Sequence, residues 1–447
     1  MTLPRYPAYK DSGVEWLGKV PGHWDVASLK RIATCNDQVL PENTPEHFEI
    51  EYVEISDVDA SQGITNSTTQ PFGNAPSRAR RRVRHGDAIV STVRTYLRAI
   101  APVVHPPENM IVSTGFAVVR PSEERLIPGF LGYAMRAEGF IGEVIARSVG
   151  VSYPAINASD LMSLAVAVPP RLDQTAIATF LDHEASKIDT LIAEQQNLIA
   201  LLKEKRQAVI SHAVTKGLNP DVPVKNSGVE WLGQVPGHWH VSPLKWLTGP
   251  GRDIMYGIVL PGPNVEQGVP IVKGGDVRPV RLRKELLNRT TAEIEAPFAR
   301  ARLNPGDIVY SIRGSIGDAE VVPEELRDAN ITQDVARISP HSEVCGRWLL
   351  FVMKSAPVFV QLEQRSLGAA VRGINIFDLK RALIPVPSGV EQEAIADFLE
   401  RKTVMIDSLI AESEHAVALL TERRSALISA AVTGKIDVRG LASQKAA

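Results

Sequence analysis

Two long segments of the chain place apolar residues at heptad spacing, the pattern of a helix that packs lengthwise against another helix. They span residues 174–215 and 392–433. From Ile177 to Val214 the first segment has 38 residues, about 57 Å of helix at ~1.5 Å per residue. A lone amphipathic helix of this length needs a partner, and the same chain offers one of matched length. The pattern predicts two paired helices, antiparallel if a pseudo-two-fold relates them. The alternative is that each helix only covers its own domain.

The residues expected between the paired helices occupy equivalent positions in the two segments. They are Leu181, Ile188, Ile192, Ile199, Leu202 and Val209 in the first, and Leu399, Ile406, Ile410, Val417, Leu420 and Leu427 in the second. Polar residues interrupt both apolar seams at matching points, which is typical of positions that fix register or orientation. These are Gln195 with Ser413, and Arg206 with Arg424.

Both segments carry signals for the ends of a helix. Ser388 and Glu391 have the spacing of a capping box, and Asp173 can cap the first helix. Gly217 and Gly434 follow the last periodic residues and supply stop signals. The two helices therefore have defined beginnings and ends.

The stretches outside the helices, roughly residues 30–165 and 245–385, alternate short β-branched runs with turn residues. This pattern predicts mixed α and β structure. The clearest strand candidates are residues 50–56, 87–93, 116–120, 308–313 and 335–339.

The sequence contains an internal repeat. Residues 12–26 and 227–241 agree at 13 of 15 positions, and the long segments align at a similar offset. Between these shared pieces the two copies hardly resemble each other. Shared ends with dissimilar middles favour one scaffold that holds two different reading surfaces; the alternative is neutral drift after duplication.

These patterns predict an α+β fold: two pseudo-symmetric mixed α/β domains separated by two long helices that form an antiparallel coiled coil. The expected divisions are a first domain at 1–170, a helix at 171–218, a second domain at 219–387, a helix at 388–436 and a tail at 437–447. A chain of 447 residues is too long for one ordinary core, which agrees with this division.

Composition indicates the cellular compartment of the protein and argues against some classes of function. The chain has 44% hydrophobic residues, two cysteines and no long apolar run, and its first residues lack the apolar core of a signal peptide. We expect a cytoplasmic protein. The net charge of −2 argues against a histone-like binder but leaves local basic patches open.

Catalytic signatures are absent from the sequence. It contains no phosphate-binding loop, nucleophile elbow, HExxH motif or zinc-ligand spacing, and residues 314–318 are too short for a dinucleotide fingerprint. We expect no catalytic residue and no metal site in this chain.

Arginine is the residue type that stands out. Two clusters lie just before equivalent strand candidates, and further arginines follow those strands. The candidate DNA-binding residues are Arg78, Arg80, Arg81, Arg82, Arg84, Arg94 and Arg98 in the first copy, and Arg278, Arg281, Arg283, Lys284, Arg300, Arg302 and Arg313 in the second. Guanidinium groups suit phosphates and the O6/N7 edge of guanine, whereas the alternative is a solvated charged face.

The repeated start phrase carries its own aromatic residues. Trp16, His23 and Trp24 return in the second copy as Trp231, His238 and Trp239. We interpret the phrase as a docking clasp. A ligand-binding or base-stacking role is the weaker hypothesis, because identical reading residues would not suit two different bodies.

These residues carry a likeness to a known family. The chain resembles the specificity subunit of type I restriction–modification systems over nearly its whole length. The likeness rests on SGVEWLGKVPGHW, on residues 306–317 and 331–338, and on the junction IPVPSGVEQEAIADFL before the second long helix. The first copy departs from the pattern because residues 86–102 lack the glycines of 314–317.

The resemblance implies a DNA-recognition subunit that is not an enzyme by itself. Each of two target recognition domains would read one half of a bipartite site, and the helices would act as a spacer of fixed length. The implied partners are double-stranded DNA, two modification subunits and the restriction subunits. S-adenosylmethionine, ATP and Mg²⁺ would be bound by those subunits. Two rival hypotheses are a stand-alone bipartite DNA binder and a nuclease with a dispersed acidic site.

Overall fold

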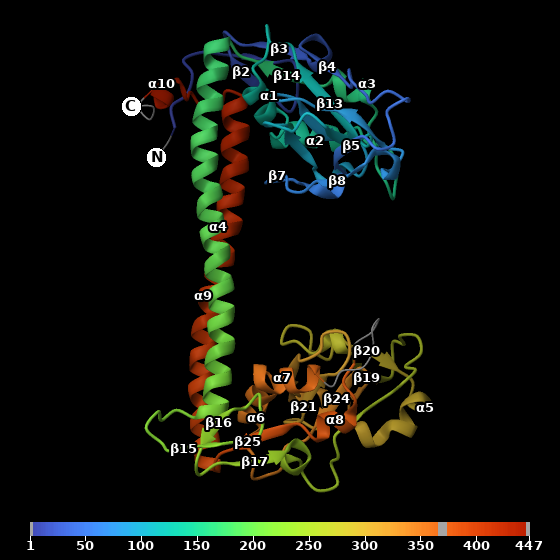
Figure 1. Ribbon diagram of the computed structural model, residues 1–447, viewed down its shortest axis with the longest axis vertical. Helices are drawn as coiled ribbons and strands as arrows, with labels where there is room; N and C mark the ends of the chain where they lie inside the picture. The colour runs from blue at the N-terminus through green and yellow to red at the C-terminus, as the bar shows by residue number, and fades with distance from the viewer. Residues whose placement is uncertain (1–2, 365–372, 444–447) are drawn as a thin grey trace. The chain divides into compact units, whose positions relative to one another are not determined.

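The computed structural model describes residues 3–364 and 373–443 (Figure 1). The chain divides into two units, each of which combines helices and strands. Unit 1 comprises Met1–Gln196 and Glu414–Ala447, and unit 2 comprises Asn197–Ser413. No helix in the described part of the chain is both long enough and apolar enough to cross a membrane.

The two long helices predicted from the heptads are present. Helix α4 runs over Arg171–Lys216 and has 46 residues; helix α9 runs over Gly389–Val432 and has 44. The capping box is confirmed, since Ser388 Oγ lies 3.4 Å from the backbone nitrogen of Glu391 and the Glu391 carboxylate accepts from the Ser388 backbone at 3.1 Å. Gly217 and Gly434 adopt φ of +76° and +73° just beyond the helix ends, as the stop signals required.

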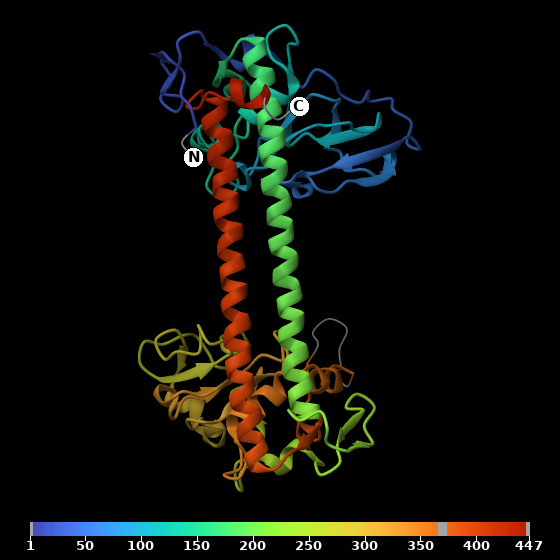
Figure 2. The same ribbon diagram turned by 90° about the vertical axis from the view of Figure 1, so that its left-hand side faces the viewer.

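Within unit 1, the start of α4 lies beside the end of α9 (Figure 2). Ile177 and Ala431 belong to one buried core, while further along the helices Arg424 lies 2.7 Å from Asp189. The residue number rises on one helix as it falls on the other, so the two segments run antiparallel.

Unit 2 repeats this arrangement with the helices exchanged. Ala213 of α4 and Ala396 of α9 share a core, and Arg206 Nε lies 2.8 Å from Asp407 Oδ1. The polar interruptions Arg206 and Arg424 are therefore cross-helix ion pairs at equivalent positions.

The predicted helix-pair residues differ in burial along the helices. Five of them are buried: Leu181, Ile188, Leu202, Leu399 and Ile406. The others are half-buried: Ile192, Ile199, Val209, Ile410, Val417, Leu420 and Leu427.

The body of unit 1 is built on two four-stranded sheets. The first has the order β11-β10-β13-β4, and the second has the order β8-β5-β12-β9, in which β12 and β5 are parallel. The strands of unit 1 are β1 (Tyr9–Asp11), β2 (Lys19–Pro21), β3 (Asp25–Ser28), β4 (Ala33–Cys35), β5 (Glu49–Val53), β6 (Val58–Asp59), β7 (Gly63–Ile64), β8 (Thr68–Pro71), β9 (Ala79–Arg82), β10 (Ala88–Ser91), β11 (Ile100–Pro102), β12 (Met110–Ser113), β13 (Phe116–Pro121) and β14 (Ala165–Val168). Its shorter helices are α1 (Pro128–Ala134), α2 (Glu138–Ala146), α3 (Ala158–Ser163) and α10 (Arg439–Ser443).

The body of unit 2 follows the same plan with a smaller second sheet. Its sheets have the orders β18-β24-β21-β22 and β20-β19-β23, and β19 and β23 are parallel. The strands are β15 (Val224–Asn226), β16 (Gln234–Pro236), β17 (His240–Pro243), β18 (Met255–Tyr256), β19 (Val269–Val272), β20 (Asn288–Thr290), β21 (Ile308–Ser311), β22 (Ala319–Val321), β23 (Asn330–Ile331), β24 (Val335–Ile338) and β25 (Leu383–Val386). The shorter helices are α5 (Ala292–Glu295), α6 (Gly346–Met353), α7 (Ala356–Glu363) and α8 (Ile376–Lys380).

All five strand candidates named from the sequence are strands or contain one: β5, β10, β13, β21 and β24. The two arginine clusters lie in different types of local structure. Arg80 and Arg82 lie in β9, whereas the aligned Arg300 lies in a 3-10 helix (Ala296–Ala301) and Arg302 follows it. The residues just before β10 and β21 therefore differ in structure between the two copies.

Candidate nucleic-acid interface

The start phrase of unit 1 is a joint between body and helices. Trp24 is fully buried, and its Nε1 donates to Asp173 Oδ2 at 3.0 Å. His23 Nε2 lies 2.8 Å from the same oxygen. A Cβ placed on Gly434, just past α9, would meet the ring of Trp24 at 3.0 Å. One tryptophan thus contacts the start of α4 and the end of α9.

Asp173 has a different role from the one predicted. It lies in the first turn of α4 and accepts from His23 and Trp24 of the start phrase. The sequence could not show this, because its partners are about 150 residues away and spacing rules concern only near neighbours.

Unit 2 builds the same joint from the second copy of the phrase. Trp239 Nε1 donates to Glu391 Oε1 at 3.2 Å, and His238 Nε2 lies 2.8 Å from that oxygen. A Cβ on Gly217, at the end of α4, would meet Trp239 at 3.2 Å. The interpretation of the phrase as a docking clasp therefore agrees with its contacts in both units.

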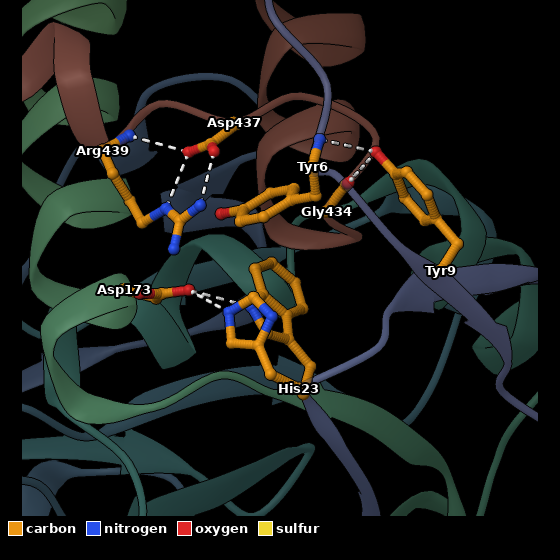
Figure 3. Close-up of polar contacts among 8 residues, drawn as sticks. Tyr6, Tyr9, His23, Asp173, Gly434, Asp437 and Arg439 are labelled. Atoms are coloured by element: carbon orange, nitrogen blue, oxygen red, sulfur yellow. Dashed lines mark hydrogen bonds and ion pairs between the residues drawn. The ribbon is translucent and has the colours of Figure 1, made fainter.

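The joint in unit 1 also holds the two ends of the chain together (Figure 3). Tyr9 Oη donates to the carbonyl of Gly434 at 3.0 Å, and the backbone nitrogen of Asp437 donates to Pro4 at 2.8 Å. Arg439 binds Asp437 at 2.6 Å, with its guanidinium carbon 4.7 Å from the ring centre of Tyr6. In unit 2 the chain runs directly from α4 to β15. In unit 1 these noncovalent contacts connect the corresponding segments, the residues after α9 and those around β1.

The joint in unit 2 confers a pH dependence. Burial alone would raise the pKa of the Glu391 carboxyl, but hydrogen bonds from His238, Ser388 and Trp239 outweigh it and lower the pKa to about 2. A depressed carboxyl pKa stabilises the folded state above the unfolded pKa of 4.5, and this stability is lost as the pH falls toward 2. The side chain is 37% exposed, so solvent screening reduces the full effect of about 3 kcal/mol to about 1 kcal/mol.

Acidification from pH 4.5 to 2 is therefore expected to lower the unfolding free energy of unit 2 by about 1 kcal/mol less in the Glu391→Gln variant than in wild type. Hydrogen exchange of the amides at the start of α9 as a function of pH would measure it. Glu343→Gln is the matched control, because that carboxylate is 89% exposed and should leave the pH profile unchanged. Equal pH profiles for wild type and E391Q would contradict the assignment.

The arginines of the first cluster are spread along β9 of unit 1. Arg78 is ion-paired with Glu54 at 2.8 Å, and the guanidinium of Arg80 lies 4.8 Å from the ring centre of Phe72. Arg81 is half-buried, and burial lowers its pKa. Only part of this cluster therefore faces solvent as free charge.

The far end of the cluster borders a hollow. Arg82 and Arg84 are exposed, with no ion pair to any described residue, and they line a pocket of about 530 Å³. His85 and His105 stack in the same pocket, with ring centres 4.6 Å apart. Arg82 and Arg84 make this pocket one candidate contact for phosphate, although Glu108 also lines it.

Two further arginines follow β10 of unit 1. Arg98 lies 3.0 Å from Glu138 in an exposed ion pair. Arg94 forms no ion pair with a described residue; its guanidinium lies 4.8 Å from the ring centre of Tyr153. Arg94 therefore keeps its charge available for a ligand.

Three of the seven candidates in unit 2 are already paired. Arg278 lies 3.4 Å from Asp318, and Arg281 lies 3.4 Å from Asp276. Arg302 forms two hydrogen bonds, of 2.8 and 2.7 Å, with the buried carboxylate of Glu295. Such a pair maintains the fold, so Arg302 is a poor candidate for DNA contact.

The remaining candidates of unit 2 are exposed and make no ion pair with a described residue. They are Arg283, Lys284, Arg300 and Arg313. Arg313 directly follows β21, and the strand it follows is the counterpart of β10. Each unit thus presents cationic side chains beyond the same strand.

Comparison with known proteins bears on these two units. No protein-family model matches the chain. It is 27% identical to the type I restriction enzyme EcoBI specificity subunit of Escherichia coli over 337 residues, 74% of this chain and 70% of that one. It is 24% identical to a Methanocaldococcus jannaschii chain described as the MjaX specificity subunit, over 95% of this chain and 96% of that one. The chain is homologous to type I restriction enzyme specificity subunits.

Two solved structures share the fold of this chain. One, from work on complex assembly and conformational transition of the type I restriction–modification system, has a TM-score of 0.67 and 23% identity, and the match covers 92% of this chain and 98% of that one. The HsdS subunit from Thermoanaerobacter tengcongensis has a TM-score of 0.50 and 22% identity over 93% of this chain and 98% of that one. The likeness supports the mixed helix-and-strand fold with its long helices.

Several residues that hold the joint were not singled out from the sequence. Gln174 Oε1 accepts from the backbone of Ile127 at 2.8 Å, and Gln392 Oε1 accepts from that of Cys345 at 2.9 Å. The identical offset of the two glutamines was the available signal. Their partners in the bodies share no sequence that could have been aligned.

Proposed function

We infer that this chain is the DNA-recognition subunit of a type I restriction–modification complex. Each unit reads one half of a bipartite site. The observation that carries this inference is that each unit presents an arginine, Arg94 or Arg313, that forms no ion pair with a described residue and lies beyond the same strand of the same sheet. Arginine forks in this setting suit phosphates and guanine edges, and homology to specificity subunits over 95% of the chain supports the assignment.

The two recognition domains are residues 1–170 and 219–387, and α4 with α9 forms an antiparallel coiled coil that sets the spacer between half-sites. The cross-helix ion pairs and the repeated tryptophan joints support this role, because they fix the register of the helices and anchor each body to both of them. A spacer that cannot slip makes the distance between half-sites part of the specificity.

Exposed apolar side chains on the long helices support docking of two modification subunits. Leu172, Leu191 and Leu419 of unit 1 are 84%, 45% and 51% exposed. Their counterparts in unit 2 at the repeat offset are Val390, Leu409 and Leu201, which are 83%, 43% and 53% exposed. Duplicated apolar positions on otherwise polar helix faces are typical of protein interfaces. The partner modification and restriction subunits would bind S-adenosylmethionine, ATP and Mg²⁺.

A methylome experiment tests this function. Co-expression with a type I modification (methyltransferase) subunit that co-purifies with this chain is expected to methylate adenine in a single bipartite motif. Replacing residues 30–165 with the body of a relative is expected to change one half-site and leave the other and the spacer intact. Change in both half-sites would refute the modular assignment.

The same experiment separates the alternatives. A stand-alone bipartite binder would bind DNA but neither co-purify with a methyltransferase nor direct methylation. A nuclease would cleave DNA as the isolated chain with Mg²⁺. Binding without cleavage by the isolated chain, together with methylation by the complex, is the expected pattern.

A further inference from the structure

Two neighbouring loops of unit 1 form an exposed tip. Residues 92–98 and 148–155 are joined by backbone bonds, since Val93 pairs with Ala155. Thr95, which is buried, donates its hydroxyl to Ser148 at 2.7 Å. The base of the tip is therefore rigid, and neither loop contains an acidic residue.

Backbone strain marks this tip. Arg94 and Arg98 have φ of +50° and +54°, the left-handed region, where a side chain costs roughly 1 kcal/mol relative to a right-handed conformation. Such strain at a side-chain-bearing residue points to a function for the side chain.

The counterpart turn in unit 2 shows how the same conformation is made without strain. Ser311 Oγ donates to the carbonyl of Arg313, as Ser91 Oγ donates to the carbonyl of Val93. The residues that follow these carbonyls, Gly314 and Arg94, therefore occupy equivalent positions. Gly314 and Gly317 have φ of +71° and +96°.

At the far end of the turn, the backbone nitrogen of Ser311 donates to the carbonyl of Asp318, as that of Ser91 donates to the carbonyl of Ala99. The residues just before these carbonyls, Gly317 and Arg98, are therefore equivalent. Glycine fits both left-handed positions freely, yet unit 1 has arginine at each. For Arg98, the ion pair with Glu138 accounts for the side chain. No contact within the described chain accounts for the charge of Arg94.

The surroundings of Arg94 fix its side chain and leave its edge free. Its guanidinium stacks on Tyr153, which is 64% exposed. The tip also exposes Tyr96 and Val151. A planar fork held against an aromatic ring, beside apolar groups and without an ion pair to a described residue, has the chemistry that reads a guanine edge with a neighbouring thymine methyl.

We propose that this tip reads a G·C base pair of the first half-site from the major groove, with Arg94 as the specificity-determining residue and Tyr153 as its positioning residue. The proposal rests on the proposed function of the chain. It also states that the half-site read by unit 1 contains a guanine whose N7 and O6 accept from Arg94.

The test compares Arg94→Gly, Arg94→Lys and Asp328→Gly in the complex with its methyltransferase partner. R94G keeps the backbone that Gly314 shows to be accessible, so its thermal unfolding should match wild type. R94G and R94K are both expected to lose about 10- to 100-fold of the discrimination at one guanine of the first half-site. D328G is the matched control, because Asp328 of unit 2 also has a positive φ, +64°, and lies outside the tip, so the variant should have the same strain relief and wild-type discrimination at the first half-site.

Substitution of 7-deazaguanine, which lacks the N7 acceptor, identifies the contact. At that one position it should weaken wild-type methylation about 10- to 100-fold and leave R94G unchanged. Equal sensitivity of wild type and R94G at every guanine would overturn the proposal. So would loss of methyltransferase binding by R94G with base preference intact, since the tip would then dock protein.

The second half-site separates this proposal from the proposed function. If wild type methylates a bipartite motif and R94G leaves both half-site preferences unchanged, only the tip assignment fails. If wild type directs no bipartite methylation, the proposed function fails.

Discussion

Insertion of seven residues after Gln195 and after Ser413, equivalent points of α4 and α9, is expected to lengthen the preferred spacer by about three base pairs. Seven helical residues add about 10.5 Å at ~1.5 Å each, and duplex DNA rises about 3.4 Å per base pair. A heptad preserves the apolar seam, so the helix pair can still form. The half-site sequences should stay the same, because neither body is altered.

Methylome sequencing would measure the new motif. Methylation of the original site is expected to fall at least about a hundredfold, because one half-site can no longer be engaged and each lost base pair costs about 1–3 kcal/mol. A seven-residue substitution that keeps the helix length is the control and should retain the original motif. An unchanged spacer after the double insertion would show that the helices do not set it.

Removal of the Asp87 carboxylate is expected to cost unit 1 about 3–5 kcal/mol of unfolding free energy. Asp87 forms two 2.8 Å hydrogen bonds with Arg120, and their side chains are only 1% and 8% exposed. Asp87→Ala would leave the guanidinium buried with only the more distant Asp37, 3.7 Å away. Hydrogen exchange of β10 and β13 amides would report the loss, while β21 and β24 of unit 2 serve as the internal reference.

A matched variant tests whether burial is the cause. Glu138→Ala removes the carboxylate that pairs with Arg98 at 3.0 Å, but these side chains are 47% and 44% exposed. An exposed pair contributes less than about 1 kcal/mol. If D87A and E138A destabilise unit 1 equally, the large effect of the Asp87–Arg120 pair is not due to its burial.

The joint shows how far a repeat can be interpreted. Near-identity of the start phrase correctly indicated a framework role, because the same contacts recur in both units at Trp24 and Trp239. The acceptors Asp173 and Glu391 differ in type, and sequence spacing indicated helix caps for both. Of the two, only Glu391 also takes part in a helix cap. The role of Asp173 became clear only from its hydrogen bond with Trp24, which is 149 residues away in the sequence.

The arginine clusters show where the sequence reached its limit. Their composition indicated surface charge, yet free and paired arginines look alike in a sequence. Arg302 is neutralised by Glu295 on an adjoining helix, whereas Arg94 remains unpaired. Electrostatic availability depends on which acids the fold brings near, and the two bodies bring different ones.

The sequence by itself determined the two long helices and the five strand candidates. These features follow from side-chain periodicity and from residues a few positions apart, which a linear pattern contains. The tertiary structure alone decided which cationic side chains are free, which carboxylates hold the tryptophans, and that Arg94 and Arg98 adopt the left-handed conformation that Gly314 and Gly317 adopt in unit 2. Those outcomes depend on contacts between distant segments and on backbone angles, and neither leaves a periodic trace in the sequence.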